Sequence, residues 1–314
     1  ALYASYGQIP LTQALFLGVK ACVVIIVIEA LLRVARRGLK TRAAWVIAGL
    51  SFGAIFALGL PFPLIILAAA IYGALTASGE NPKPVPNANP LPTILTWTAI
   101  WWTPVAIAYA AKATLLTEIG LYFSRLAVVT FGGAYSVLAY MTQSVVTDKG
   151  WLTTTAMIDG LGLAETTPGP LILVTEFVGY QAGAAIGPGT ALLAAAMTLW
   201  VTFTPCFLWI FAGAPYIAQL TTRPRPKAAL QAISAAVVGV ILSLSLWFAL
   251  HVFFTELGEI HIFRARIPLP DPTSLNWRAL VIALAAAYAL LIRHMNLITV
   301  LILAAVAGSL LAQL

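Results

Sequence analysis

Charged residues are scarce in this chain: Asp, Glu, Lys and Arg together make up only 9% of its 314 residues. A soluble domain carries roughly 25% charged residues. Hydrophobic residues make up 61% of the chain, and the mean hydropathy is +0.97. The scarcity of charge excludes an ordinary soluble domain and predicts an all-α polytopic membrane protein, because a helix satisfies its own backbone hydrogen bonds in lipid.

Cysteine and histidine are also rare. Cys22 and Cys206 lie in apolar runs, and the three histidines are far apart and lack the spacing of metal ligands. The chain has no Walker A loop, GxSxG elbow or HExxH helix, so nothing indicates ATP hydrolysis or hydrolase chemistry. A membrane-embedded lipid enzyme would show acidic clusters or paired histidines. We therefore expect no enzyme activity, no metal and no cofactor.

Acidic residues are fewer than basic ones, at 10 against 17, which gives a net charge of +7. The basic residues cluster in short loops, a pattern that indicates membrane orientation rather than nucleic-acid binding. Segment 33–42 holds five basic residues and no acidic one, and segment 219–227 holds Arg223, Arg225 and Lys227. By the positive-inside rule, both segments are predicted to be cytoplasmic.

Long apolar runs account for most of the chain. A spanning helix needs roughly 20 apolar residues, and runs near this length lie at 14–35, 43–59, 60–76, 94–111, 119–145, 188–212, 228–252, 278–293 and 296–313. The apolar region 153–186 is interrupted, and we interpret it as two half-helices. These runs predict about ten transmembrane helices. No basic residues precede the first run, so we do not expect it to be a signal peptide.

Two glycine- and proline-containing breaks interrupt the apolar sequence. FGG occupies 131–133, and ETTPGP occupies 165–170. Irregular backbone at membrane depth is tolerated only where it is buried in protein or lines a cavity. Two such breaks about thirty residues apart predict a transport or binding site.

An internal repeat is visible in the apolar segments. Residues 21–35 align with 235–249 at a separation of 214, and 46–76 align with 281–311 at a separation of 235. We therefore expect 1–76 to be the last three helices of one unit, 77–112 a proline-rich linker with one extra helix, and 113–314 a complete second unit. Because both basic segments are predicted to be cytoplasmic, equivalent helices would run in opposite directions, as in inverted-repeat transporters.

The series FGGAYSVLAYMTQSVV, then DGLGLAETTPGPLILVTEFVGYQAG, resembles the second half of bacterial chromate ion transporters of the long-chain type. LYASYGQIP at the start, followed by ALFLGVKACVVIIVIEALLRV, resembles the middle of that family's first half. The resemblance implies export of chromate, with sulfate as the related oxyanion, across the bacterial cytoplasmic membrane, driven by the proton or membrane potential. It also implies further glycine and proline motifs upstream of Ala1.

Chromate and sulfate are tetrahedral dianions, and helix N-termini offer them free N–H groups and partial positive charge. Glycines at the first break would let the backbone approach an anion, and prolines suit the first turn of a half-helix. Tight helix crossings are the alternative interpretation of both breaks. The residues predicted to bind substrate are Arg125, Phe131, Gly132, Gly133, Tyr135, Gln143, Thr166, Thr167, Pro168, Gly169 and Pro170.

Ionisable groups within apolar segments are functional candidates by default. Glu165 and Glu176 are the predicted proton-coupling residues; helix capping or ion pairing is the alternative for Glu165. Arg125 is predicted to contact the anion, with an ion pair to Glu118 as its alternative. We expect Lys20 to extend toward the membrane surface and Asp159 to lie near an interface.

The expected partners are a chromate or sulfate oxyanion and the lipid bilayer. A homodimer, or a missing N-terminal half, could complete the binding site. Two other functions stay open: transport of sulfate or another small anion, and an inactive fragment or assembly subunit.

Overall fold

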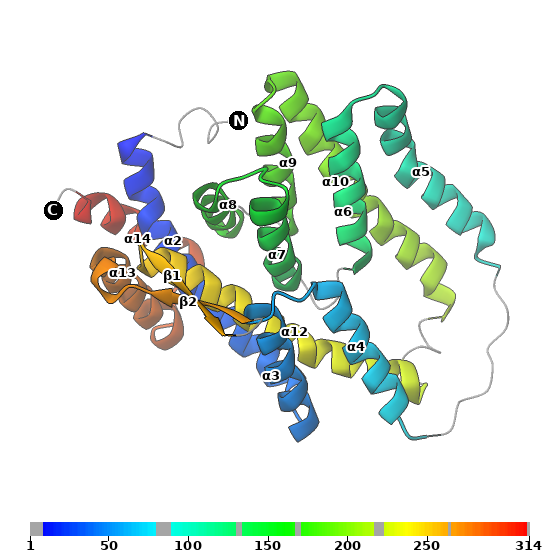
Figure 1. Ribbon diagram of the computed structural model, residues 1–314, viewed down its shortest axis with the longest axis horizontal. Helices are drawn as coiled ribbons and strands as arrows, with labels where there is room; N and C mark the ends of the chain where they lie inside the picture. Colours follow the sequence, from blue (N-terminus) through cyan, green and yellow to red (C-terminus); the bar gives the residue numbers. More distant parts are fainter. Residues whose placement is uncertain are drawn as a thin grey trace.

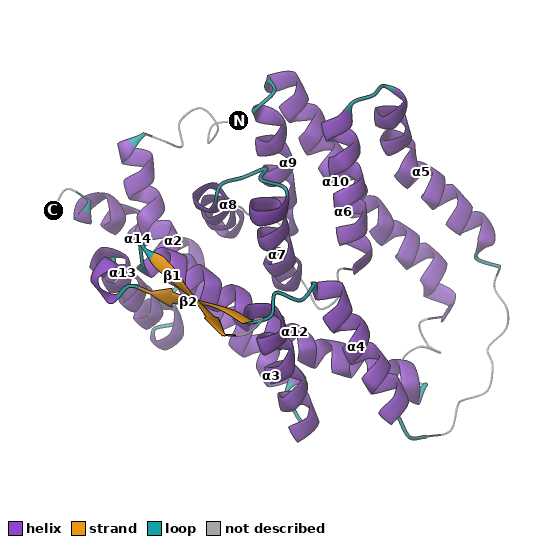
Figure 2. Cartoon of the chain, in the orientation of Figure 1, coloured by secondary structure: helices purple, strands orange, loops and turns teal. Residues whose placement is uncertain are grey.

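The computed structural model describes residues 9–79, 89–129, 134–166, 171–216, 223–262 and 265–312. The chain is almost entirely helical within these ranges (Figure 2). This confirms the predicted all-α polytopic fold. Four helical segments are long and apolar enough to span a membrane: Pro10–Gly38, Leu91–Ala110, Pro188–Tyr216 and Pro224–Phe253.

Most helices begin and end within a few residues of the predicted apolar runs. They are α2 (Pro10–Gly38), α3 (Arg42–Phe56), α4 (Phe62–Thr76), α5 (Leu91–Ala110), α10 (Pro188–Gly213), α12 (Pro224–Phe253), α13 (Trp277–Ala287) and α14 (Leu297–Leu311). Local sequence explains several of these starts. Proline occupies the first turn of α2, α4, α5, α10 and α12, while Asn276 and Asn296 cap α13 and α14 with their side chains.

The predicted run 119–145 contains α6 (Thr114–Val129) and α7 (Ala134–Gln143), and a π-helical turn, η1 (Ser144–Asp148), follows α7. Residues 130–133 between the two helices lie outside the described ranges, so the single helix stays a prediction. Region 153–186 holds α8 (Thr154–Thr166), the short 3₁₀ turn η2 (Leu171–Leu173) and α9 (Val174–Ala184), as the two predicted half-helices require.

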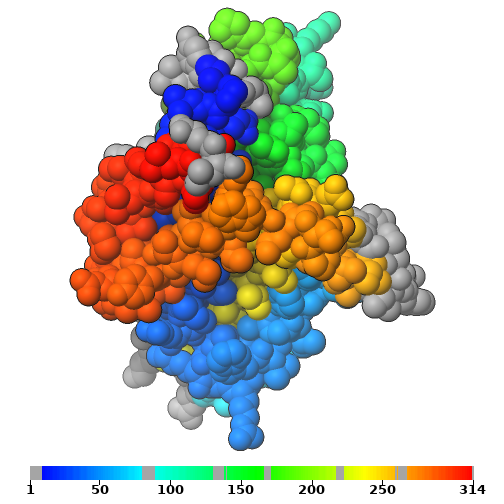
Figure 3. All heavy atoms as spheres, turned by 90° about the vertical axis from the view of Figure 1, so that its left-hand side faces the viewer, coloured from blue at the N-terminus to red at the C-terminus, as the bar shows by residue number. Residues whose placement is uncertain are grey.

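An antiparallel hairpin between α12 and α13 was not predicted. Strand β1 (Leu257–Ile262) pairs with β2 (Ala265–Pro270), with Leu257 opposite Pro270 and Ile260 opposite Ile267. The remaining short turns are η3 (Ala214–Tyr216), η4 (Pro272–Ser274) and η5 (Tyr288–Ile292). Figure 3 shows the hairpin beside α13 and α14 on one face of the molecule.

Helices α2 and α12 each pack against helices from the opposite end of the chain. N-terminal α2 packs against C-terminal α13 and α14, whereas α12 packs against α3 and α4. Helices α2 and α12 also pack against each other, so they form the centre of this group (Figure 1). Among the remaining helices, α10 contacts α5, α6 and α9, whereas α7 packs against α12 and α8 packs against α2 and α9.

Two glycine crossings in this group correspond residue by residue. A Cβ on Gly308 of α14 would collide with the backbone of Ala14 and Gly18 on α2, and a Cβ on Gly73 of α4 would collide with Ala228 and Ala232 on α12. Gly73 and Gly308 differ by 235, whereas Ala14 and Ala228, like Gly18 and Ala232, differ by 214. These are the separations of the two sequence alignments, so the aligned segments meet in the same way at both ends of the chain.

We predict that Gly73→Val and Gly308→Val destabilise the protein to similar degrees, by about 1–3 kcal/mol or more, because each side chain would push two helices apart. Thermal unfolding in detergent would measure the loss. Gly53→Ala on α3 is the control, since a Cβ there meets nothing within 4 Å. An unchanged melting temperature for either valine variant would show that its crossing does not need glycine.

Candidate functional site

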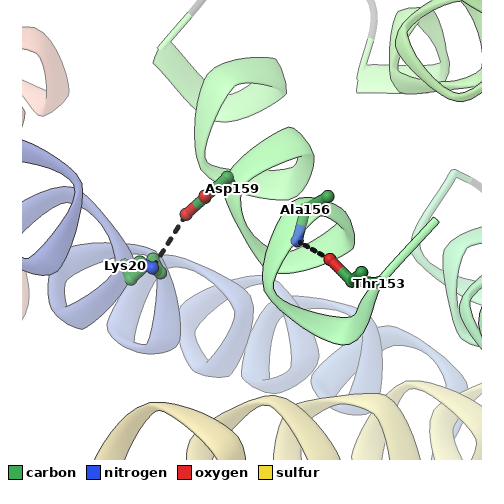
Figure 4. A network of polar contacts seen from close by, with 4 residues as sticks. All are labelled: Lys20, Thr153, Ala156 and Asp159. Carbon is green, nitrogen blue, oxygen red and sulfur yellow. Dashed lines mark hydrogen bonds and ion pairs between the residues drawn. The ribbon is translucent and has the colours of Figure 1, made fainter. Parts of the chain in front are cut away.

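A buried ion pair joins α2 to α8. Lys20 Nζ lies 2.8 Å from Asp159 Oδ1, and the two side chains are 15% and 1% exposed (Figure 4). Asp159 points from the broken region toward the first long helix of the chain. The expectation that Lys20 extends to the membrane surface was therefore wrong, whereas the position of Asp159 near the membrane interface stays a prediction. Each charge has its partner inside the protein, which avoids the cost of an isolated charge in an apolar setting.

Further along the same two helices, Glu165 of α8 lines a pocket of about 460 Å³. Glu29 and Arg33 of α2 form another part of its wall, and His294 contributes from the turn between η5 and α14. Arg33 Nη2 donates to Glu29 Oε1 at 2.8 Å, one helical turn away. The pocket therefore lies between α2, α8 and the C-terminal helices.

The lining of this pocket carries groups of both charges. It includes two carboxylates, Glu29 and Glu165, and one guanidinium, Arg33, which contacts Glu29. His294 adds a further titratable group. A dianion placed beside ionised Glu165 would be repelled, whereas a proton on Glu165 would remove that repulsion.

Of the other predicted site residues, those whose side chains the structure describes do not line this pocket. Glu176 lies in the first turn of α9 and is partly buried. Arg125 on α6 and Gln143 at the end of α7 have exposed side chains. Glu118, the alternative partner of Arg125, instead lies 4.0 Å from Lys149. Among the predicted site residues whose side chains the structure describes, Glu165 alone lines the pocket.

The predicted break residues fall mostly outside the described ranges. Tyr135 belongs to α7, and Thr166 ends α8. The remaining substrate-binding predictions lie outside the described residues: Phe131, Gly132, Gly133, Thr167, Pro168, Gly169 and Pro170. Their roles stay predictions.

Sequence reasoning did not assign Glu29, Arg33 and His294 to a site. A signal for the first two was present, because Glu29 and Arg33 are four residues apart and face the same side of a helix. The pairing of Lys20 with Asp159 had a weaker signal. Both charges interrupt apolar segments, but 139 positions separate them in the sequence, and only the packing of α2 against α8 brings them together.

We predict that Lys20→Met and Asp159→Leu each destabilise the protein by about 3–5 kcal/mol, because each leaves a buried charge without its partner. The double variant Lys20→Met/Asp159→Leu should recover most of that loss. Unfolding free energies for the four proteins form a double-mutant cycle. Additive losses would mean that the two charges do not interact. The exposed pair Glu29–Arg33 is the comparison, and removing it should cost at most about 1 kcal/mol.

Comparison with known proteins identifies the family of the chain. Residues 117–309 match the chromate transporter family. The chain is 31% identical to a chromate transport protein of Pseudomonas aeruginosa over 232 residues, which cover 73% of this chain and 53% of that protein. It is also 31% identical to a chromate transport protein of Cupriavidus metallidurans, over 44% of this chain and 34% of that protein.

A probable chromate transport protein of Synechococcus elongatus is 30% identical, over 42% of this chain and 32% of that protein. The chain thus spans about half, or less, of the length of these curated relatives. No solved structure matches it. The family match covers more than half of the chain, including both broken segments and the Glu165 pocket's contributions from α8 and α14, so this polytopic membrane protein belongs to the chromate transporter family.

Proposed function

We propose that this chain is part of a secondary transporter that exports chromate across the bacterial cytoplasmic membrane, with sulfate as a related substrate. The observation that carries the proposal is the position of Glu165, which lies in the last turn of α8 and lines the pocket with Arg33 and His294. Family membership and the names of the relatives support chromate as the substrate.

In this proposal the proton and the anion occupy neighbouring sites. The carboxylate of Glu165 takes and releases a proton in the pocket. The oxyanion binds at the breaks 131–133 and 166–170, where half-helix N-termini would offer N–H donors. The ionised Glu165 repels a dianion, and its protonation removes the repulsion. Occupancy by the proton and by the anion would thereby be linked.

The proposed architecture is a pair of inverted units that meet around α2 and α12. Two observations support it. The glycine crossings of α14 with α2 and of α4 with α12 involve equivalent residues. In addition, Arg37 and Lys40 of the first basic segment line the same pocket as Lys227 of the second, so the two segments lie together. A missing N-terminal half or a second copy of the chain would complete the first unit.

The test is uptake of chromate into inside-out vesicles, with and without a protonophore and with excess sulfate. This chain would be compared with a version lengthened upstream to the length of its relatives. We expect protonophore-sensitive uptake by the longer form, reduced by excess sulfate. No chromate uptake by either form would remove chromate from the proposal, and uptake of sulfate alone would favour the sulfate transporter.

In the active form, Glu165→Gln should lower uptake more than about tenfold and abolish its response to the protonophore, since a carboxamide cannot carry the proton. Glu256→Gln is the matched control, because Glu256 is exposed near the hairpin and lies outside the pocket. Arg125→Ala tests the predicted anion contact in the same assay. Full activity of both Glu165→Gln and Arg125→Ala would contradict the charged roles assigned to them.

A further inference from the structure

A second pocket, of about 650 Å³, lies where the end of α2, the start of α3, the end of α4 and the start of α12 meet. Arg37 and Lys40 of the first basic segment line it together with Lys227 of the second. All three side chains are exposed. No acidic residue is among those that the structure places on its wall, and none of these three cations forms an ion pair within the described ranges. The pocket is therefore a concentration of uncompensated positive charge.

The rest of the wall is largely apolar. Ile47, Leu230 and several alanines line the pocket together with the hydroxyl-bearing Thr41 and Tyr72. On the last turns of α4, Ile71 and Leu75 are 49% and 80% exposed, so they continue an apolar surface outward from the pocket. A free inorganic oxyanion would gain nothing from that surface. An anionic phospholipid carries a phosphate for the cations and acyl chains for the apolar surface.

The position of the pocket along the membrane normal also favours an anionic phospholipid. Both basic segments are predicted to be cytoplasmic by the positive-inside rule, and the pocket lies at the ends of the apolar helices rather than midway along them. Basic pockets between membrane helices on the cytoplasmic side bind lipid headgroups. No residue of α8 lines this pocket, so it is separate from the pocket that contains Glu165.

We propose that this basic pocket binds the phosphate headgroup of an anionic phospholipid from the cytoplasmic leaflet. Arg37, Lys40 and Lys227 contact the phosphate, and the acyl chains lie against α4. The pocket includes Gly73, Ala228 and Ala232, which form the close crossing of α4 with α12. A lipid bound there stabilises that crossing and hence the junction between the first and last parts of the chain.

The experiment uses this chain, purified in detergent and stripped of lipid. Native mass spectrometry and thermal unfolding follow its titration with phosphatidylglycerol, with phosphatidylcholine and with inorganic phosphate. The pocket variant is Arg37→Gln/Lys40→Gln/Lys227→Gln. The matched control is Arg36→Gln/Arg42→Gln/Arg225→Gln, which removes three exposed cations from the same segments but outside the pocket. Both variants change the net charge equally.

We expect phosphatidylglycerol to bind and to raise the melting temperature, whereas phosphatidylcholine and inorganic phosphate do neither at equal concentration. The pocket variant should bind phosphatidylglycerol at least about tenfold more weakly, because each cation near a lipid headgroup contributes roughly fivefold. The control variant should bind within about twofold of the unmodified chain. Binding should also weaken as salt screens the cations.

Two results would overturn the proposal. Equal weakening in both variants would mean that the lipid responds to net charge rather than to this pocket. An equal stabilisation by inorganic phosphate would mean that the pocket binds a small oxyanion and that the acyl chains of a lipid add nothing to binding. Lipid binding is measured without transport. A negative lipid-binding result therefore does not affect the chromate uptake assay, and a negative uptake result does not affect the lipid-binding measurement.

Discussion

The close approach of helices at glycine is the constraint on which the arrangement of this protein depends. Without a hydrophobic driving force between helices in lipid, association relies on tight packing, and small residues let the backbones come together. Here Gly73 and Gly308 allow α4 and α14 to lie directly on α12 and α2. Since α2 comes from the start of the chain and α14 from its end, the same contacts also join the two ends into one body.

That packing positions the polar groups. Helix α2, which packs against α13 and α14, also contacts α8, and there Lys20 meets Asp159. Glu165 of α8 lines the pocket with Glu29 and Arg33. Charges that would be costly when isolated are paired or grouped at a junction between helices from distant parts of the chain. A junction of this kind can respond to protonation, because removing one charge changes the balance of the whole group.

Much of the fold was predictable from the sequence because its signals are local. Apolar runs located most helices, and the interruption at 166–170 separated α8 from α9. Apolar composition failed at the hairpin, whose two strands depend on pairing with each other. The partner of Lys20 was not predictable, since the approach of α2 to α8 is a consequence of tertiary packing. Glu165 was predicted as a functional residue, but its neighbours from α2 and the His294 turn were not.

In the proposed architecture, α2 and α12 are equivalent helices with opposite orientations in the membrane. Single cysteines at Arg36, Arg225 and Glu256, in a Cys206→Ser background, can be labelled with an impermeant maleimide in vesicles of each orientation. Cys22 is buried and stays in place. If the two helices are inverted, positions 36 and 225 are labelled from the cytoplasmic side and position 256 from the opposite side. Labelling of positions 36 and 225 from different sides would rule out the inverted arrangement.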